Sequence, residues 1–573
     1  MAGRSEVAGL RVAFGAGLVL AALAASSAVA WQFDFAAELG RPLWWRLYDP
    51  LAVVRWGLAW GFTEAYRGPF AAGLATAGAL VVLPVLALRV LDLYGPLRVG
   101  GQDPDAGLGT ARDLTRAGQI AARGDGVVVG GAGRRVLRDH GDGHVLVLGT
   151  TRSGKTAGHA VPTLLLHTGS MLVFDPKGEL AVVTRRRRAL LGPVHLIDPT
   201  SRDSARLNPL LELRTGDHLR GDCQMAAHML THTGAHAPGH DPFWDSAAAN
   251  VCSALLVHVR TSPDPTLAHL YHLAQDLAAE RYPETRDPFV LAVLDAHRAQ
   301  EAKMRSSVAT TLTTRLAFLG DPLVQQATNE SDFRPSDLQA DERPITVFLQ
   351  VPVAQAERLR PLTRLLVQSL LLPLMQDLGR TADGRAKRRG LLLLLEEFPQ
   401  LGRLDVVENG LAVSAGYGVR AMLLCQDEDQ IARHYGERQT ITSLCSTVCA
   451  MAGYSKGSLQ TIARWGGEHT VAHGSKQRPA GVGGTASESQ SETRAAVLNV
   501  RELLRRSRAE VLVLTIGAPP TWLRKVRYFT DPTFRGLYDP PTAAAPEPAT
   551  RTAGGTTTEE EDPWLTMATT RWN

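Results

Sequence analysis

The sequence predicts an α/β fold in which a buried parallel sheet presents a phosphate-binding loop. An apolar run, His144–Leu148, leads directly into a glycine-rich loop that matches the pattern G-x-x-x-x-G-K-[ST]. A second run, Leu391–Leu395, is unbroken, as expected of a strand covered on both faces, and two glutamates follow it. A third run, residues 421–424, ends in Cys425-Gln426-Asp427. Such strands indicate a sheet with a ligand crevice at its carboxyl edge.

The glycine-rich loop is the most specific feature of the chain. Its backbone N–H groups can cradle the phosphates of a nucleoside triphosphate, and we expect a helix from Ala157 onward. Lys155 should reach the β- and γ-phosphates, and the Thr156 hydroxyl should bind Mg²⁺. The loop therefore predicts ATP and Mg²⁺ as cofactors. The expected nucleotide-binding residues are Gly149, Thr150, Thr151, Arg152, Ser153, Gly154, Lys155 and Thr156.

The two glutamates after the second strand are the expected partners of this loop. Acids at the carboxyl end of a parallel strand point into the nucleotide crevice. We expect Glu396 to complete the Mg²⁺ site with Thr156, and Glu397 to orient or deprotonate the attacking water. Gln426, after the third strand, is placed to sense the γ-phosphate and polarise water. The expected catalytic residues are therefore Glu397, Lys155 and Gln426.

Length and composition limit the possible classes of protein. The chain has 573 residues, enough for two or three domains, and a net charge of +4, too small for a strong basic field over the whole molecule. Its five cysteines form no C-x-x-C pair, which argues against a disulfide framework and fits a reducing compartment. We expect Cys445 and Cys449, four residues apart, to be core thiols on a helix.

The N-terminal region predicts a membrane anchor over residues 1–91. Two apolar stretches, about 12–30 and 70–90, are long enough to span a bilayer as helices, with a short periplasmic segment between them. Arg4 and Arg11 before the first stretch suit a hairpin with both ends in the cytoplasm. The first stretch also has features of a signal peptide, but its length favours a retained anchor.

The remaining chain divides by its pattern of apolar residues. Strand and helix signals alternate in two regions, a purely helical pattern separates them, and the end is rich in Pro, Ala and Thr. A Gly- and Ser-rich stretch, 466–491, reads as a loop. The predicted boundaries are a connector at 92–141, a nucleotide-binding domain at 142–214 and 336–540, an all-α domain at 215–335 and a disordered tail at 541–573.

Four basic clusters have two interpretations. They are residues 185–188, 385–389, 505–508 and 524–527. Each can be a solvated or lipid-facing surface, and together they could line a channel that follows a phosphate backbone.

The order of the motifs resembles that of TraG/TraD-like coupling proteins of type IV secretion, the inner-membrane ATPases of bacterial conjugation. The similarity extends from about residue 10 to 540. The motifs are Gly109-Thr-Ala-Arg112, the phosphate loop, Asp175-Pro-Lys-Gly-Glu-Leu180, Asn208-Pro-Leu210, Leu395-Glu-Glu-Phe-Pro-Gln-Leu-Gly402, Gly416-Tyr-Gly418, Cys425-Gln-Asp427, Tyr435-Gly436, Arg501-Glu-Leu-Leu504, Tyr528-Phe529 and Asp531.

This resemblance implies a RecA-like P-loop ATPase domain with an inserted all-α domain and an N-terminal transmembrane hairpin. It also implies a homo-hexameric ring at the bacterial inner membrane, with the ATPase domain in the cytoplasm. The implied partners are single-stranded DNA with its relaxase, or protein effectors, and the components of the secretion channel.

Two positions depart from the family pattern. Glu396-Glu397 stands where relatives usually have Asp-Glu, and Ala415 stands where many have an arginine finger; Arg403 or Arg420 could replace that arginine. Two other functions therefore stay open. One is an FtsK-like translocase of duplex DNA, although such motors usually have more membrane segments. The other is an ATP-gated docking receptor with little turnover.

Overall fold

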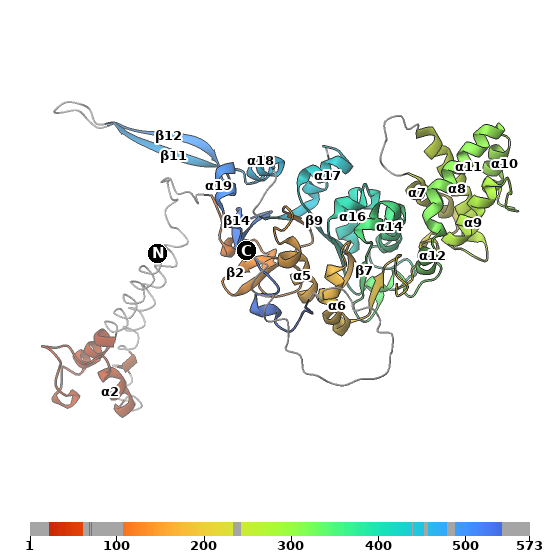
Figure 1. Cartoon of the computed structure of the whole chain (residues 1–573). Coiled ribbons are helices and arrows are strands. Elements are labelled where there is room, and N and C mark those ends of the chain that lie inside the picture. Colours follow the sequence, from red (N-terminus) through yellow and green to blue (C-terminus); the bar gives the residue numbers. More distant parts are fainter. Residues whose placement is uncertain are drawn as a thin grey trace, which may run out of the picture. The chain divides into compact units, whose positions relative to one another are not determined.

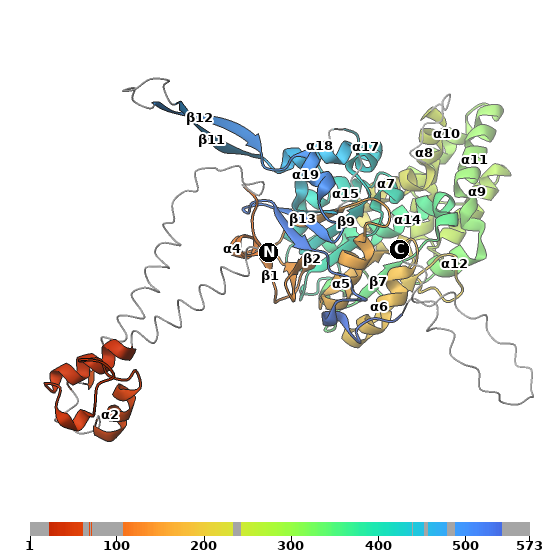
Figure 2. The ribbon, with the colours of Figure 1, turned by 60° about the vertical axis from the view of Figure 1, so that its left-hand side comes forward.

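The computed structural model describes residues 22–60, 68, 70–71, 107–232, 242–437, 439–451, 456–477 and 487–540. The chain divides into two compact units, one formed by 1–103 with 471–491 and the other by 104–470 with 492–573. The candidate site lies entirely in the second unit. Figure 1 labels the elements, and Figure 2 shows the same ribbon from another side.

The second unit is built on a mixed sheet. Its twelve described strands follow the order β1-β3-β2-β14-β13-β10-β4-β9-β8-β5-β7-β6. The seven strands from β10 to β6 are parallel to one another. These are β10 (Cys445–Met451), β4 (His144–Leu148), β9 (Val419–Cys425), β8 (Leu391–Leu395), β5 (Ser170–Phe174), β7 (Thr346–Leu349) and β6 (Val194–Ile197).

The other five strands form an antiparallel flank beside β10. Three of them come from the stretch that we expected to be a connector, so that expectation is wrong for residues 120–139. Their pattern is obscured by Gly130, whose Cβ would lie 2.9 Å from the Leu523 side chain, so a larger residue does not fit. The strands are β1 (Ile120–Ala121), β2 (Val127–Ala132), β3 (Arg135–Asp139), β13 (Glu510–Thr515) and β14 (Thr521–Arg524).

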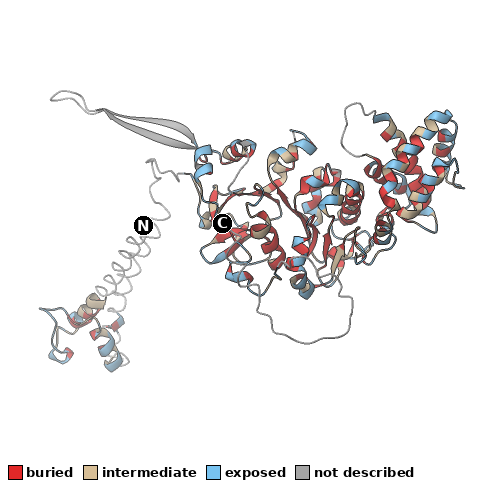
Figure 3. Ribbon diagram, viewed as in Figure 1, coloured by how far each residue is buried: buried red, intermediate tan, exposed pale blue. Residues whose placement is uncertain are grey.

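Both faces of the parallel strands are covered, as their continuous apolar sequences require. In β4, Val145 and Val147 pack toward one face, and Leu146 and Leu148 toward the other, because successive side chains alternate along a strand. The first face carries η3 (Thr156–Ala160), a π-helix, with α5 (Val161–Leu166) and α6 (Glu179–Leu191), and the second carries α14 (Ala356–Leu371). Figure 3 shows the sheet as the most deeply buried layer.

Between β6 and β7 the described residues form helices without a strand. They include an apolar core shared with the second face of the sheet. That this segment is a separate inserted domain stays a prediction. The helices are α7 (Leu219–Thr231), α8 (Pro242–Thr261), α9 (Leu267–Ala278), α10 (Pro288–Arg298), α11 (Ala302–Leu316), α12 (Pro322–Thr328) and α13 (Asp337–Ala340).

Two further expectations were wrong. Cys445 and Cys449 are buried thiols, but they lie in strand β10, because a four-residue spacing also fits the same face of a strand. The stretch expected to be a loop forms a two-stranded hairpin, β11 (Glu468–Gln477) and β12 (Ser487–Ala496). The other helices are α4 (Ala111–Arg116), α15 (Asp405–Glu408), α16 (Leu411–Ser414), α17 (Glu428–Tyr435), α18 (Lys456–Trp465) and α19 (Val500–Arg505).

The first unit has a small core of its own. Tyr48 and Trp56 of this core pack in a T-shaped arrangement, with ring centroids 5.1 Å apart, and Trp56 lies in α2 (Ala52–Trp60). None of the helices in the described residues combines the length and the hydrophobicity needed to cross a bilayer. Much of the stretches 12–30 and 70–90, like the tail 541–573, lies outside those residues, so the transmembrane hairpin stays a prediction.

Candidate nucleotide-binding site

Four neighbouring strands bring the candidate site together at the carboxyl edge of the sheet. The strands lie in the order β4, β9, β8 and β5. Parallel strands end at the same edge of a sheet, so the segments that follow these strands lie side by side. In strand order they are the phosphate loop after β4, Gln426 after β9, Glu396 after β8 and Asp175 after β5. Gln426 therefore follows the strand, β9, that lies between β4 with its phosphate loop and the strands that precede the acids.

The phosphate loop has an unusual backbone. Arg152 has φ +61° and Gly154 has φ +93°, so two left-handed residues flank Ser153. Left-handed residues in a loop can turn N–H groups toward a bound anion. In this conformation the Ser153 N–H donates to the Thr150 carbonyl at 3.1 Å. The loop continues directly into the π-helix η3, a form that often occurs at functional sites. That this loop binds phosphate through residues 149–156 stays a prediction.

Lys155 is folded back over this loop. Its Nζ donates to the Gly149 carbonyl at 2.5 Å and lies 3.8 Å from Glu397 Oε1. Burial lowers the pKa of Lys155, while the Glu397 carboxylate raises it in part. Glu397 itself has φ +50°, a left-handed conformation that is strained for a glutamate. Contacts with the surrounding structure must therefore stabilise this backbone conformation.

Thr156 and Glu396 meet directly. The Thr156 hydroxyl donates to Glu396 Oε1 at 2.5 Å. Burial raises the pKa of Glu396 to about 7, although the bond from Thr156 opposes this shift. The two residues that were expected to hold Mg²⁺ are thus in contact.

Asp175 is a site residue that we did not assign from the sequence. It follows β5, the neighbour of β8, and its Oδ2 accepts from the Ala181 backbone N–H at 2.9 Å. Burial raises its pKa to about 6. The sequence does indicate that Asp175 follows an apolar strand. It does not show that this strand, β5, lies beside β8.

The acidic oxygens fit a divalent cation. Within the described residues, Glu396 Oε2 and Asp175 Oδ1 are buried without a hydrogen-bond partner, as is Ser153 Oγ in the loop. Buried carboxylate oxygens without a partner are costly unless a ligand completes them, and Mg²⁺ prefers oxygen ligands. The donor set of Thr156, Glu396 and Asp175 therefore suits Mg²⁺ beside the phosphate loop.

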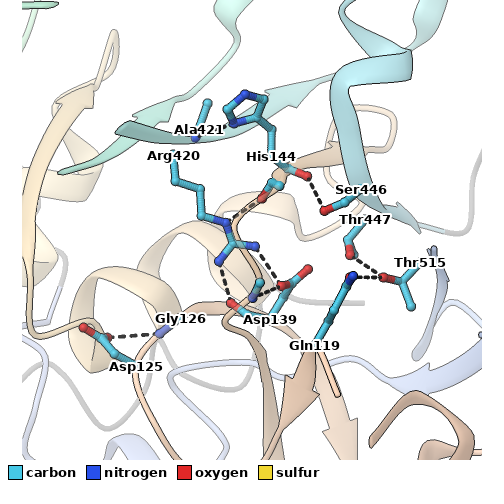
Figure 4. Close-up of polar contacts among 12 residues, drawn as sticks. Gln119, Asp125, Gly126, Asp139, His144, Arg420, Ala421, Ser446, Thr447 and Thr515 are labelled. Carbon is cyan, nitrogen blue, oxygen red and sulfur yellow. Dashed lines mark hydrogen bonds and ion pairs between the residues drawn. The ribbon is translucent and has the colours of Figure 1, made fainter. Parts of the chain in front are cut away.

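Arg420 cannot serve as an arginine finger in this conformation. Its guanidinium donates to Asp139 Oδ1 at 2.7 Å and to the Gly143 carbonyl at 2.6 Å, at the amino-terminal edge of the sheet (Figure 4). The Asp139 side chain is fully buried in this pair. Arg403, the other candidate, is 59% exposed and pairs with Glu408 at 3.0 Å.

Three of the basic clusters contain a cation that has a structural partner, and whether the clusters face solvent, lipid or a phosphate backbone stays a prediction. Arg188 is buried and donates to the Gly169 carbonyl, and Arg385 pairs with Asp337 and Asp383. Lys525 is buried and donates to the Ser153 carbonyl at 3.0 Å. The sequence could not distinguish these cations from solvated ones, because their partners are distant in the chain.

Comparison with known proteins places the chain among conjugation proteins. It is 28% identical over 466 residues to the conjugal transfer protein TraG of Escherichia coli, covering 73% of this chain and 72% of TraG. It is 31% identical over 434 residues to the protein VirD4 of Agrobacterium fabrum, covering 71% and 62% of the two chains. The solved structure of the bacterial conjugative coupling protein TrwBdeltaN70 has a TM-score of 0.55 at 16% identity, covering 73% and 92%.

These findings define first a class and then a family. The fold is an α/β nucleotide-binding fold with a mixed sheet, as in TrwB. Residues 106–550 match the family described as Type IV secretory system Conjugative DNA transfer, and the chain belongs to this family. The resemblance expected from the motif order, and with it a coupling role in conjugative DNA transfer, is confirmed.

Proposed function

We propose that this chain binds ATP with Mg²⁺ at the carboxyl edge of the sheet and hydrolyses ATP to drive conjugative transfer. The observation that most supports this is the Thr156–Glu396 contact, which joins the phosphate loop to an acid 240 residues away. The unpartnered oxygens of Glu396 and Asp175 support the cation. Structures of TrwB, whose fold is similar, were solved with ADP and Mg²⁺ and with an ATP analogue.

Each side chain of the site then has a role. Lys155 turns from Glu397 toward the β- and γ-phosphates, and Thr156 and Glu396 hold Mg²⁺, with Asp175 supporting them. Bound Mg²⁺ neutralises charge on the phosphates. Glu397 orients or deprotonates the attacking water, and Gln426, directly after the intervening strand β9, senses the γ-phosphate.

The cargo and setting follow from the family. Single-stranded DNA with its relaxase, or a protein effector, is passed to the secretion channel. The stretches 12–30 and 70–90 anchor the chain in the inner membrane as a multi-pass protein, and the ATPase domain lies in the cytoplasm. A homo-hexameric ring, as the family resemblance implies, would let a neighbouring subunit supply an arginine to the site.

The experiment is ATP binding and turnover by the full-length chain in detergent, with and without single-stranded DNA. Lys155→Ala should abolish ATP binding without lowering the melting temperature, and Lys303→Ala, an exposed lysine on α11, is the control. Equal ATP affinity in Lys155→Ala and wild type would refute the assignment. Binding without turnover, with or without DNA, would instead identify a docking receptor.

A further inference from the structure

The chain after β14 crosses the elements that follow the phosphate loop. We call residues 525–539 the strap. The Tyr528 N–H donates to the Ala157 carbonyl at 3.2 Å, and the Asp539 N–H donates to the Val183 carbonyl at 3.0 Å. Arg186 of α6 pairs with Asp539 at 2.6 Å. The strap is therefore fixed to both η3 and α6, the two elements that begin at the nucleotide edge.

The strap also fits closely against η3. A Cβ on Gly158 would lie 2.9 Å from the Val526 carbonyl oxygen, so the absence of a side chain at Gly158 lets the two backbones approach. At its start the strap is held by Arg524, whose guanidinium donates to Asp531 Oδ2 at 2.9 Å. Lys525, between these contacts, thus lies on a segment with little freedom to move.

Lys525 reaches from the strap to the phosphate loop itself. Its side chain is 7% exposed, and Nζ donates to the Ser153 carbonyl at 3.0 Å. Burying a charged ammonium group costs free energy, and the charge-assisted hydrogen bond to the Ser153 carbonyl must offset this cost. The acceptor is the residue between the two left-handed positions, Arg152 and Gly154.

The direction of this bond determines the direction of an N–H group in the loop. In a trans peptide the C=O of one residue and the N–H of the next point in opposite directions. A cation that holds the Ser153 C=O on the strap side therefore turns the Gly154 N–H toward the opposite side. A phosphate bound by the Gly154 N–H would lie on that side of the loop.

We infer that Lys525 is a positioning residue for the phosphate loop: it fixes the Ser153–Gly154 peptide so that the Gly154 N–H faces the bound phosphates. The inference rests on the proposed ATP site and adds a residue 372 positions from its contact in the loop. No atom of Lys525 needs to touch ATP.

The charges around Lys525 make this role dependent on pH. Burial, together with the nearby charges of Arg527 and Arg508, lowers its pKa to about 8. From η3 it faces His159, whose own pKa burial lowers to about 4, so this imidazole is neutral near pH 8. Below pH 8 the ammonium makes a charge-assisted bond, which weakens when the amine becomes neutral at higher pH.

The test uses ATP·Mg²⁺ as the probe and the full-length chain in detergent. We expect Lys525→Met to weaken ATP binding about tenfold at pH 7.5, the loss of one hydrogen bond from a charged group. Lys525→Arg, which keeps a charged donor, should retain most of the affinity. Arg535→Met, an exposed cation on the same strap, is the matched control and should bind ATP like wild type.

A pH series separates positioning from a merely structural role. Between pH 7.5 and 9.5 the wild-type affinity should fall more steeply than that of Lys525→Arg, because a guanidinium does not titrate in this range. This comparison decides the question even if Lys525→Met does not fold. Identical profiles for wild type and Lys525→Arg, or wild-type affinity in Lys525→Met, would overturn the inference.

Failure of the proposed function would look different. If Lys155→Ala binds ATP as well as wild type, the ATP site itself is wrong. If Lys155→Ala loses ATP binding while Lys525→Met keeps it, the site stands and only the role of Lys525 is refuted.

Discussion

The contact between Lys155 and Glu397 predicts that Glu397→Gln has two opposite effects. The Lys155 Nζ lies 3.8 Å from Glu397 Oε1, and both side chains are largely buried. To bind ATP, Lys155 must turn toward the phosphates, so the carboxylate competes for it and also repels the γ-phosphate. We therefore expect the variant to bind ATP more tightly, but to lose the group that orients the attacking water.

The size of the first effect follows from the geometry. Two unit charges 3.8 Å apart attract each other by about 4 kcal/mol at an effective dielectric constant of about 20. Most of this is offset, because burial of both charges costs free energy and Lys155 keeps its bond to the Gly149 carbonyl. We expect a net gain of about 1 kcal/mol, or roughly fivefold in Kd. Turnover should fall by a factor of about 10²–10⁴, as for the loss of a general base.

The assay measures ATP binding by equilibrium titration and hydrolysis by phosphate release on the same preparation. Glu357→Gln provides the control, because Glu357 is an exposed glutamate of α14 paired with Arg360. It should leave both quantities unchanged. The melting temperature of each variant shows whether the fold is intact.

Two results would refute this reasoning. If Glu397→Gln hydrolyses ATP at the parent rate, Glu397 is not the base and Glu396 becomes the better candidate. If the variant binds ATP more weakly than wild type, Lys155 and Glu397 do not compete with the phosphates, and the contact must hold the loop in its binding conformation.

Three further predictions concern the cation, pH and the arginines. Glu396→Gln should remove most of the Mg²⁺ dependence of ATP binding, measured by titration with Mg²⁺ or with a chelator; undiminished dependence would refute its role. Burial lowers the pKa of His159 from 6.5 to about 4. Between pH 6.5 and 4 the unfolded state therefore binds more protons than the folded state, so the folded state should lose stability as the pH falls through this range. Thermal melts should show a shallower slope in His159→Asn, and an equal slope would assign the loss to other groups. Arg420→Ala should destabilise the fold by about 3–5 kcal/mol, because it leaves the buried Asp139 carboxylate without its ion-pair partner. Arg403→Ala should leave stability unchanged, and it should lower ATP turnover if Arg403 acts on a neighbouring subunit. Denaturant unfolding and ATPase assays distinguish these outcomes.

The sequence predicted the strands of the parallel core well, because those strands are apolar throughout. Leu391–Leu395 and His144–Leu148 need no tertiary information to be recognised, since burial on both faces dictates their composition. The phosphate loop could also be recognised from the sequence, because its glycines and Lys155 form a motif of consecutive residues. The antiparallel flank was missed, because strands such as Val127–Ala132 contain glycines that look like a connector.

Contacts between distant segments were beyond the sequence. Asp175 belongs to the site only because β5 lies beside β8, and strand order is set by the packing of the whole sheet. From the sequence, Lys525 was a member of a basic cluster and Arg420 a candidate arginine finger. Their roles depend on single carbonyl and carboxylate acceptors that lie 277 to 372 residues away.

These two cations have a common effect on the architecture. Arg420 joins β9 of the parallel core to Asp139 of β3 at the amino edge, and Lys525 joins the phosphate loop to the segment after β14 at the carboxyl edge. Strands β14 and β2 pair at Arg524 and Gly131, one residue from Lys525. The flank is therefore tied to the nucleotide-binding strands at both edges. It is also the part of the sheet nearest in sequence to the predicted membrane anchor. The Ser153–Lys525 bond and the adjacent Arg524–Gly131 pairing link the phosphate loop to β2 of this flank. A path that runs through one lysine can be tested directly. If Lys525 transmits a movement of Ser153 on ATP binding, nucleotide-dependent protection of the β2 amides from hydrogen exchange must disappear in Lys525→Met and persist in Arg535→Met.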